Sequence, residues 1–214
     1  MPTYWTASRI ANQLHHTALA PFGFVRAGRI CERLDGGLRR TLSVHTRTSG
    51  SRPQVQLNVG VAVADLPTPV TSHRCDSLNG TAETAVGREW YPLPASDQPL
   101  PSDLLADVSG PLLEFLLAAK DLDGFVLWAQ DIYLGHEHPG WWGRFRPVLP
   151  QGTGPLEAAA FAAAAKGDTK LVEFLTARVE NEQVGEHHFD DFLAELRQLH
   201  PGVQQRHPIV RPVT

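Results

Sequence analysis

One segment of the sequence indicates the class of fold more clearly than any other, and it reads Gln54-Val-Gln-Leu-Asn-Val-Gly-Val-Ala-Val63. Every second residue is Val or Leu, and the residues between them are polar or small. Successive side chains of a β-strand point to opposite faces of a sheet. This alternation therefore predicts a strand that buries one face and leaves the other face polar.

Two further strands are predicted before this one. The first runs from about Val25 to Leu34, and Asp35-Gly36-Gly37 then suits a tight hairpin, because glycine reaches the backbone conformations that such turns need. The return strand begins at Leu38 and alternates as well. Its mostly apolar face carries Leu38, Arg40, Leu42, Val44 and Thr46, and its other face carries Arg39, Thr41, Ser43, His45 and Arg47. Short connections make the three strands an antiparallel meander.

Helical patterns flank the meander. Residues 7–20 have apolar side chains at helical spacing, and Pro21 ends this helix, which we expect to cover the apolar face of the sheet. The segment after the meander is rich in Pro, Thr, Ser and Asp, and we expect it to be a long, loop-rich excursion. From Ser102, the predicted N-cap, the chain becomes helical. The predicted helices cover residues 102–117, 122–134, 155–166, 169–182 and about 189–200.

These elements predict an α+β fold in a single domain. An N-terminal helix lies on a three-stranded antiparallel meander, and a mostly helical C-terminal half follows. The parts of the domain are the helix with the meander (1–64), the excursion (65–101), the helical part (102–200) and a tail (201–214).

The composition is that of a globular protein. Hydrophobic residues make up 42% of the 214 residues and charged residues 20%, which is enough apolar surface for one buried core. The N-terminus lacks the basic and apolar regions of an export signal, and no segment approaches the ~20 apolar residues that cross a bilayer. The chain has two cysteines, Cys31 and Cys75, which is too few for a disulfide framework, and we expect both to be reduced thiols. We expect a cytoplasmic protein with no membrane partner.

The net charge of −4 is unevenly distributed. Residues 1–64 carry eight Arg against Glu32 and Asp35, a net charge of +6, whereas residues 65–214 have a net charge of −10. A basic region can bind an acidic partner, and the acidic half of the same chain is the nearest one. The acidic majority, with a pI near 6.2, opposes the binding of nucleic acid.

Several motifs occur in the order known from one bacterial family. They are Leu19-Ala-Pro-Phe-Gly-Phe-x-Arg-x-Gly28, Gln56-Leu-Asn-Val-Gly-Val61, a His-x-Cys element at His73 and Cys75, the aromatic pair Trp90-Tyr91 and the helix junction Gly167-Asp168. Over most of its length the chain resembles the family called domain of unknown function 4304. It departs from that family in the aromatic pair, which is usually Trp-Trp, and in the region from Gly135 to Gly154. The resemblance implies a bacterial protein and a fold, but no reaction.

The polar face of the meander is the first candidate for a functional surface. Strand periodicity brings to one face a set of side chains that can recognise carboxylates or phosphates, namely Arg39, His45, Arg47, Gln56 and Asn58. Two other interpretations stay open: the face is simply solvated, or the acidic C-terminal helices cover it.

The segment after residue 134 holds two further candidates. Trp141 and Trp142, followed by Arg144, can stack on a ligand or anchor a loop to the body of the protein. His136-Glu137-His138, together with His187, offers ligands for a divalent transition metal. The helical zinc-protease pattern instead needs two His four residues apart, and a polar turn explains this cluster as well.

No Gly-x-Ser-x-Gly, Walker or dinucleotide-binding glycine motif occurs in the sequence. Our leading hypothesis is therefore a non-enzymatic cytoplasmic interaction protein, of the accessory or immunity-like kind, that uses no cofactor and binds an acidic protein surface. The alternative hypothesis is a metal-dependent hydrolase built on His136, His138 and His187. The sequence leaves the oligomeric state open.

Overall fold

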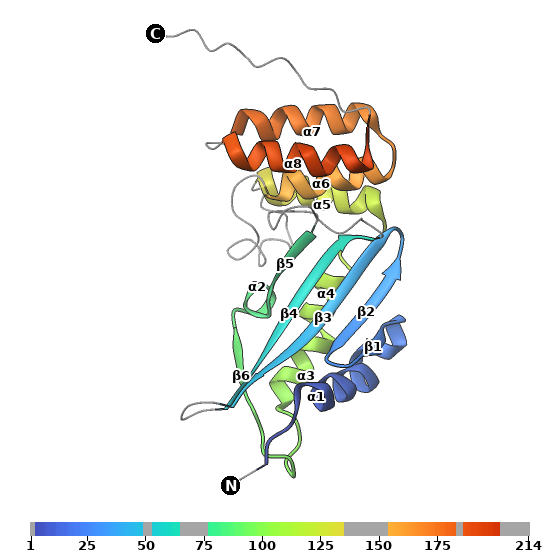
Figure 1. The fold of residues 1–214 in the computed structure, drawn as a ribbon. Helices are drawn as coiled ribbons and strands as arrows, with labels where there is room; N and C mark the ends of the chain where they lie inside the picture. The colour runs from blue at the N-terminus through green and yellow to red at the C-terminus, as the bar shows by residue number, and fades with distance from the viewer. Residues whose placement is uncertain (1–2, 49–52, 65–76, 135–153, 183–185, 202–214) are drawn as a thin grey trace.

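The computed structural model describes residues 3–48, 53–64, 77–134, 154–182 and 186–201 (Figure 1). An N-terminal helix leads into an antiparallel sheet, and a mostly helical half follows, so the predicted α+β fold class is confirmed. The α-helices are α1 (Ala7–Leu14), α2 (Glu83–Val86), α3 (Ser102–Ser109), α4 (Pro111–Leu116), α5 (Leu122–Leu134), α6 (Gly154–Ala165), α7 (Thr169–Glu182) and α8 (Glu186–Leu199).

The sheet extends beyond the three predicted strands. Its strands are β1 (Val25–Ala27), β2 (Ile30–Asp35), β3 (Leu38–Arg47), β4 (Gln54–Val63), β5 (Ser77–Thr81) and β6 (Trp90–Pro92). They pair in the order β1-β2-β3-β4-β5, with β6 also on β4, and every pairing is antiparallel. The predicted strand from Val25 to Leu34 is itself a hairpin, because a turn at Gly28 (φ 61°) folds β2 back on β1.

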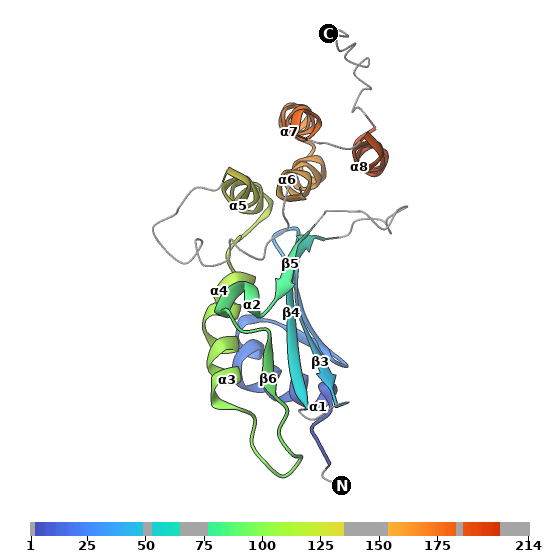
Figure 2. The same ribbon diagram turned by 90° about the vertical axis from the view of Figure 1, so that its left-hand side faces the viewer.

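One face of the sheet, here called the inner face, packs on helices and forms the main core. Helices α1 and α4 contact it directly, and Figure 2 shows α3 and α4 on this side. The alternating apolar residues of β3 and β4 are buried here, as the sequence predicts, among them Leu42, Val44, Leu57 and Val59. Alternation in the sequence thus identifies the buried face of both long strands.

Two of the predicted helices, residues 7–20 and 102–117, are shorter in the structure. After α1 the chain continues as a π-helical turn over His15–Leu19 and a 3-10 turn over Ala20–Phe22. The helix predicted for residues 102–117 is divided into α3 and α4, because Pro111 has no N–H to continue the hydrogen bonding of the preceding turn. The predicted N-cap role of Ser102 is also wrong, since Pro101 is the N-cap and makes no side-chain capping bond.

Helices α5 to α8 form a separate layer at one end of the sheet (Figures 1 and 2). The central helix is α6, which contacts α5, α7 and α8 as well as β4 and β5. All residues from Gly154 to Ala164 are buried, and most are alanine, whose small side chain lets neighbouring helices approach closely. Because this layer lies beyond the end of the sheet, helices α5 to α8 leave the polar face uncovered.

A buried arginine joins the sheet to the helical layer. Arg40 projects from β3 into the core and is 1% exposed. Its guanidinium binds the Asp35 carboxylate, and its Nη1 also donates to the Asp35 carbonyl oxygen at 3.1 Å. Its Nη2 donates to the carbonyl oxygens of Ala119 at 2.6 Å and Lys120 at 3.2 Å. Because residues 119 and 120 connect α4 to α5, Arg40 fixes the β2–β3 hairpin to the entrance of the helical layer.

Cys31 on the inner face makes the stability of the fold depend on pH. Its thiol is buried and donates to the carbonyl oxygen of Ala11 at 3.7 Å. Burial raises the pKa of Cys31 to about 11, an effect that the nearby Arg26 opposes. Above about pH 8.5 the unfolded chain releases a proton that the folded chain keeps, so the free energy of unfolding falls as the pH rises. The loss is about 1.4 kcal/mol per pH unit until the folded thiol ionises.

Urea unfolding at about pH 8 and about pH 10 measures this effect. The matched control is Cys31→Ala, which removes the thiol and leaves the other titrating groups in place. Between these two pH values we expect the unmodified protein to lose about 2 kcal/mol more than the variant. Equal losses in the two proteins would show that the Cys31 thiol ionises as freely in the fold as in the unfolded chain.

Candidate protein-binding surface

The face of the sheet opposite α1, α3 and α4 is here called the outer face, and the side chains of β3 on it are exposed or half-buried. Arg39 and Arg47 are exposed on it, and Thr41, Ser43 and His45 are half-buried. Figure 2 shows the sheet nearly edge-on, with α3 and α4 on one side and α5 to α8 beyond its end. Among the described residues, the interpretation in which C-terminal helices cover this face is therefore wrong.

Four of the predicted residues are distributed over the outer face in two groups. His45 is the cross-strand partner of Gln56, and Arg47 is the partner of Gln54, so these side chains lie together at one end of β3 and β4. This group, with Trp90 of β6 opposite Gln56, is here called the basic end. Gln56 Nε2 donates to Glu89 Oε1 at 2.9 Å, which orients the amide.

Arg39 lies apart from the basic end. It lies eight positions before Arg47 on the same strand, a distance of about 27 Å at the rise of a β-strand. Its Nε lies 3.5 Å from Glu32 Oε2, and both side chains are exposed by more than a third. Arg39 therefore belongs to a different part of the outer face, and its charge is partly compensated.

Asn58, the fifth predicted residue, occupies the middle of the outer face between Ser43 and Thr81. Its Oδ1 atom is buried and has no hydrogen-bond partner in the described part of the chain. The same holds for the hydroxyl of Thr81 on the neighbouring strand. Asn58 thus offers a partner less accessible polar surface than His45 or Arg47.

One contact on the outer face joins the residue types of a hydrolytic dyad. Ser43 Oγ lies 3.3 Å from His45 Nε2. A nucleophilic serine needs a base that a third group orients and a nearby donor set for the developing oxyanion. Within residues 3–48, 53–64, 77–134, 154–182 and 186–201, no carboxylate binds His45. The geometry supports a surface hydrogen bond and gives no support to hydrolysis.

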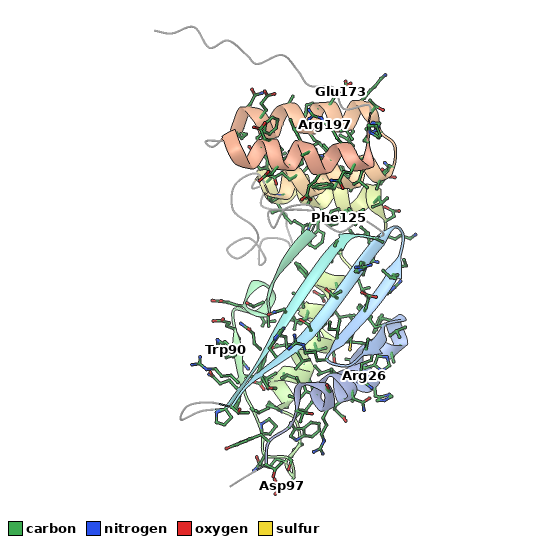
Figure 3. The ribbon with its side chains drawn as sticks, in the orientation of Figure 1. Arg26, Trp90, Asp97, Phe125, Glu173 and Arg197 are labelled. Atoms are coloured by element: carbon green, nitrogen blue, oxygen red, sulfur yellow. The ribbon has the colours of Figure 1, made fainter. Side chains whose placement is uncertain are left out.

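The structure adds to the outer face a residue that the sequence reasoning did not propose for a site. The aromatic pair at the start of β6 divides between the two faces: Tyr91 is buried, and its hydroxyl donates to Asp107 Oδ2 at 2.9 Å, whereas Trp90 belongs to the outer side and is half-buried. Figure 3 shows Trp90 at the β6 side of the sheet. The alternation of faces in a strand predicts this division once the pair is recognised as a strand.

The remaining predicted site residues are not among those described on the outer face. The part of the chain that the structure describes does not include His136, His138, Trp141, Trp142 or Arg144. It also does not include His73 and Cys75, the His-x-Cys element of the family resemblance. His187 lies in the first turn of α8. The described residues contain no group of three or more His, Cys, Asp or Glu side chains that could hold a metal ion, and they contain no helix long and apolar enough to span a bilayer.

Comparison with known proteins returns no match among protein families, curated proteins or solved structures. The geometry of the outer face is therefore the basis for assigning a function.

Proposed function

We propose that this chain is a non-enzymatic protein-interaction module whose basic end binds an acidic surface of another protein. The observation that carries the proposal is an accessible basic group on a sheet face that none of the described helices covers. Arg47 is exposed, and His45, Gln54 and Gln56 beside it are only half-buried. A surface of this kind has donors for carboxylates without the positioned groups that catalysis needs.

Arg47 differs from three other arginines of the sheet, whose guanidinium groups bind carboxylates. Arg33 and Arg40 share the Asp35 carboxylate, and Arg39 pairs with Glu32. In the described part of the chain, no carboxylate pairs with Arg47. An unpaired guanidinium offers two parallel hydrogen bonds to a carboxylate, which gives both attraction and direction.

Trp90 and the two glutamines add contact surface next to this charge. Tryptophan and arginine are enriched at the centres of protein interfaces, because tryptophan buries a large area with little loss of side-chain freedom and arginine donates directional hydrogen bonds. The amides of Gln54 and Gln56 can donate and accept hydrogen bonds at the same edge. The basic end therefore combines charge, amide groups and an aromatic ring over neighbouring strands.

The proposal includes the setting in which the module works. We infer a bacterial cytoplasmic protein of the accessory or immunity-like kind, related to the family called domain of unknown function 4304. The order of the turn, hairpin and aromatic motifs supports that relationship, and the sheet-forming motifs do occupy strands β4 and β6. This inference bears on the kind of partner and adds no catalytic role.

Charge reversal at the basic end tests the proposal. The tagged protein is used as bait in a lysate of its host, and bound proteins are quantified by mass spectrometry. We expect Arg47→Glu to reduce recovery of a specific acidic protein by at least about tenfold, because it replaces attraction by repulsion. The matched control is Lys170→Glu, the same change of charge on an exposed side chain of α7.

The two variants together decide the outcome. If Arg47→Glu recovers the same proteins in the same amounts as the unmodified bait, the basic end is not the binding surface. If Lys170→Glu lowers recovery as much as Arg47→Glu, the effect is one of net charge and the proposal is wrong as well.

A further inference from the structure

Three large aliphatic side chains are exposed side by side on the outer face of β1 and β2. Val25 is 70% exposed, Ile30 is 39% exposed and Leu34 is 54% exposed. Val25 is the cross-strand partner of Glu32, which lies between Ile30 and Leu34 on the same face of β2. We call this group, with Glu32 and Arg39, the aliphatic corner.

The aliphatic corner reverses the pattern of the neighbouring strands. On β3 and β4 the aliphatic residues point into the core and the polar residues point outward. On β2 the inner face carries Cys31, Arg33 and Asp35, so the two large aliphatic residues are left on the solvent side. Clustered exposed aliphatic residues on a sheet near its edge mark a surface that associates with another protein surface.

The charges within the corner favour one occupant. Glu32 and Arg39 are the charged groups among the aliphatic side chains, they lie 3.5 Å apart, and their charges cancel. Because these charges cancel, the corner favours neither an acidic nor a basic partner. A second copy of the same corner, related by a two-fold axis, matches both features. Arg39 of one copy faces Glu32 of the other, and the aliphatic side chains of the two copies face each other.

We propose that two copies of this chain associate through the aliphatic corner in a two-fold symmetric dimer. Val25, Ile30 and Leu34 of each copy supply the apolar contact, and Glu32 of one copy pairs with Arg39 of the other. The contact is made by the faces of β1 and β2. Edge-to-edge pairing through β1 is disfavoured, because this strand has only three residues.

This inference goes beyond the proposed function and uses another part of the outer face. Arg47 lies about 27 Å along β3 from Arg39, so the basic end stays accessible in the dimer. A dimer would present two basic ends to an acidic partner. The tests of the two proposals use different residues, so the failure of one leaves the other standing.

Sedimentation velocity from about 1 to about 100 µM tests the dimer, since small interfaces associate in this range. We expect the unmodified chain to form a dimer and Leu34→Asp to raise its dissociation constant at least about tenfold, because the variant places a charge against apolar surface. The matched control is Leu127→Asp, the same change at a leucine that is 64% exposed on helix α5 instead of on the sheet. Circular dichroism checks that both variants keep the fold.

Three results would overturn the dimer. They are a monomer at every concentration in the unmodified chain, a dimer that persists unchanged in Leu34→Asp, and a loss of dimer in Leu127→Asp as great as in Leu34→Asp.

A charge swap tests the predicted pairing. Glu32→Arg or Arg39→Glu alone places like charges together and should weaken the dimer, whereas the double variant restores both the pair within each copy and the pair between copies. The double variant is expected to dimerise nearly as well as the unmodified chain. A double variant that dimerises no better than the singles would refute the pairing of Glu32 with Arg39.

Discussion

Replacing Arg40 by alanine should lower the free energy of unfolding by about 2 to 5 kcal/mol, because the core loses a buried side chain that binds several backbone carbonyl oxygens. The side chain is 1% exposed and binds the Asp35 carboxylate together with three carbonyl oxygens. Burial lowers the pKa of Arg40, and the Asp35 carboxylate opposes that effect, so the carboxylate helps to keep the buried guanidinium charged. Without the guanidinium, the carbonyl oxygens of residues 119 and 120 lose their donor.

The next residue on the strand provides the control. Arg39 also carries an ion pair, but its side chain is 47% exposed. Exposed pairs contribute little, so Arg39→Ala should change the free energy of unfolding by about 1 kcal/mol or less. Urea unfolding followed by circular dichroism measures both variants at a concentration at which both are monomeric. If Arg40→Ala loses no more stability than Arg39→Ala, the guanidinium is not what fixes the hairpin to the helices.

Gly36→Ala should destabilise the same junction by about 2 to 5 kcal/mol. Gly36 has φ +58°, a conformation that costs an L-residue about 1 to 2 kcal/mol. A Cβ atom there would lie only 2.4 Å from the carbonyl oxygen of Lys120. Since that oxygen belongs to the backbone, the hairpin or the connection from α4 to α5 must move, which adds the energy of overpacking.

Gly28→Ala separates the cost of the backbone conformation from the cost of the steric overlap. Gly28 has nearly the same conformation, φ +61°, but no atom lies within 4 Å of the added Cβ. Its substitution should therefore cost only the conformational part, about 1 to 2 kcal/mol. The difference between the two variants in urea unfolding measures how tightly the hairpin packs on the helical layer. Equal effects would mean that the hairpin tip is not held against Lys120.

Much of the fold follows from local sequence patterns. The alternation of β3 and β4 predicts both strands and their buried faces, and it even assigns Arg40 to the apolar side of β3. Helices α5 and α7 begin and end at the predicted residues. These elements are long and strongly periodic, so the hydrophobic pattern outweighs the other signals.

The sequence-based predictions are wrong where a single residue or a contact between distant segments decides the structure. The turn at Gly28 divides one predicted strand into two, and Pro111 divides one predicted helix into two. The place of the acidic helices depends on how α6 packs on the ends of β4 and β5, which no local pattern encodes. The same packing leaves the outer face open.

The aliphatic corner was missed for a related reason. On β2 the inner residues are small or charged, and Arg33 reaches the carbonyl oxygen of Phe22 at 2.8 Å as well as Asp35. Periodicity alone cannot tell which side of such a strand faces the core, because apolar residues on the solvent side look like core residues. The register with β3 settles the orientation.

The central claim is that the outer face is a surface on which another protein docks. A photoreactive phenylalanine analogue placed at Thr41, in the middle of that face, tests it most directly in living host cells, with the same residue at Glu173 of α7 as the control. Irradiation should give a covalent adduct from the Thr41 position, with either a second copy or an acidic protein, and little or none from the Glu173 position. No adduct at Thr41, or equal adducts at both positions, would contradict the account.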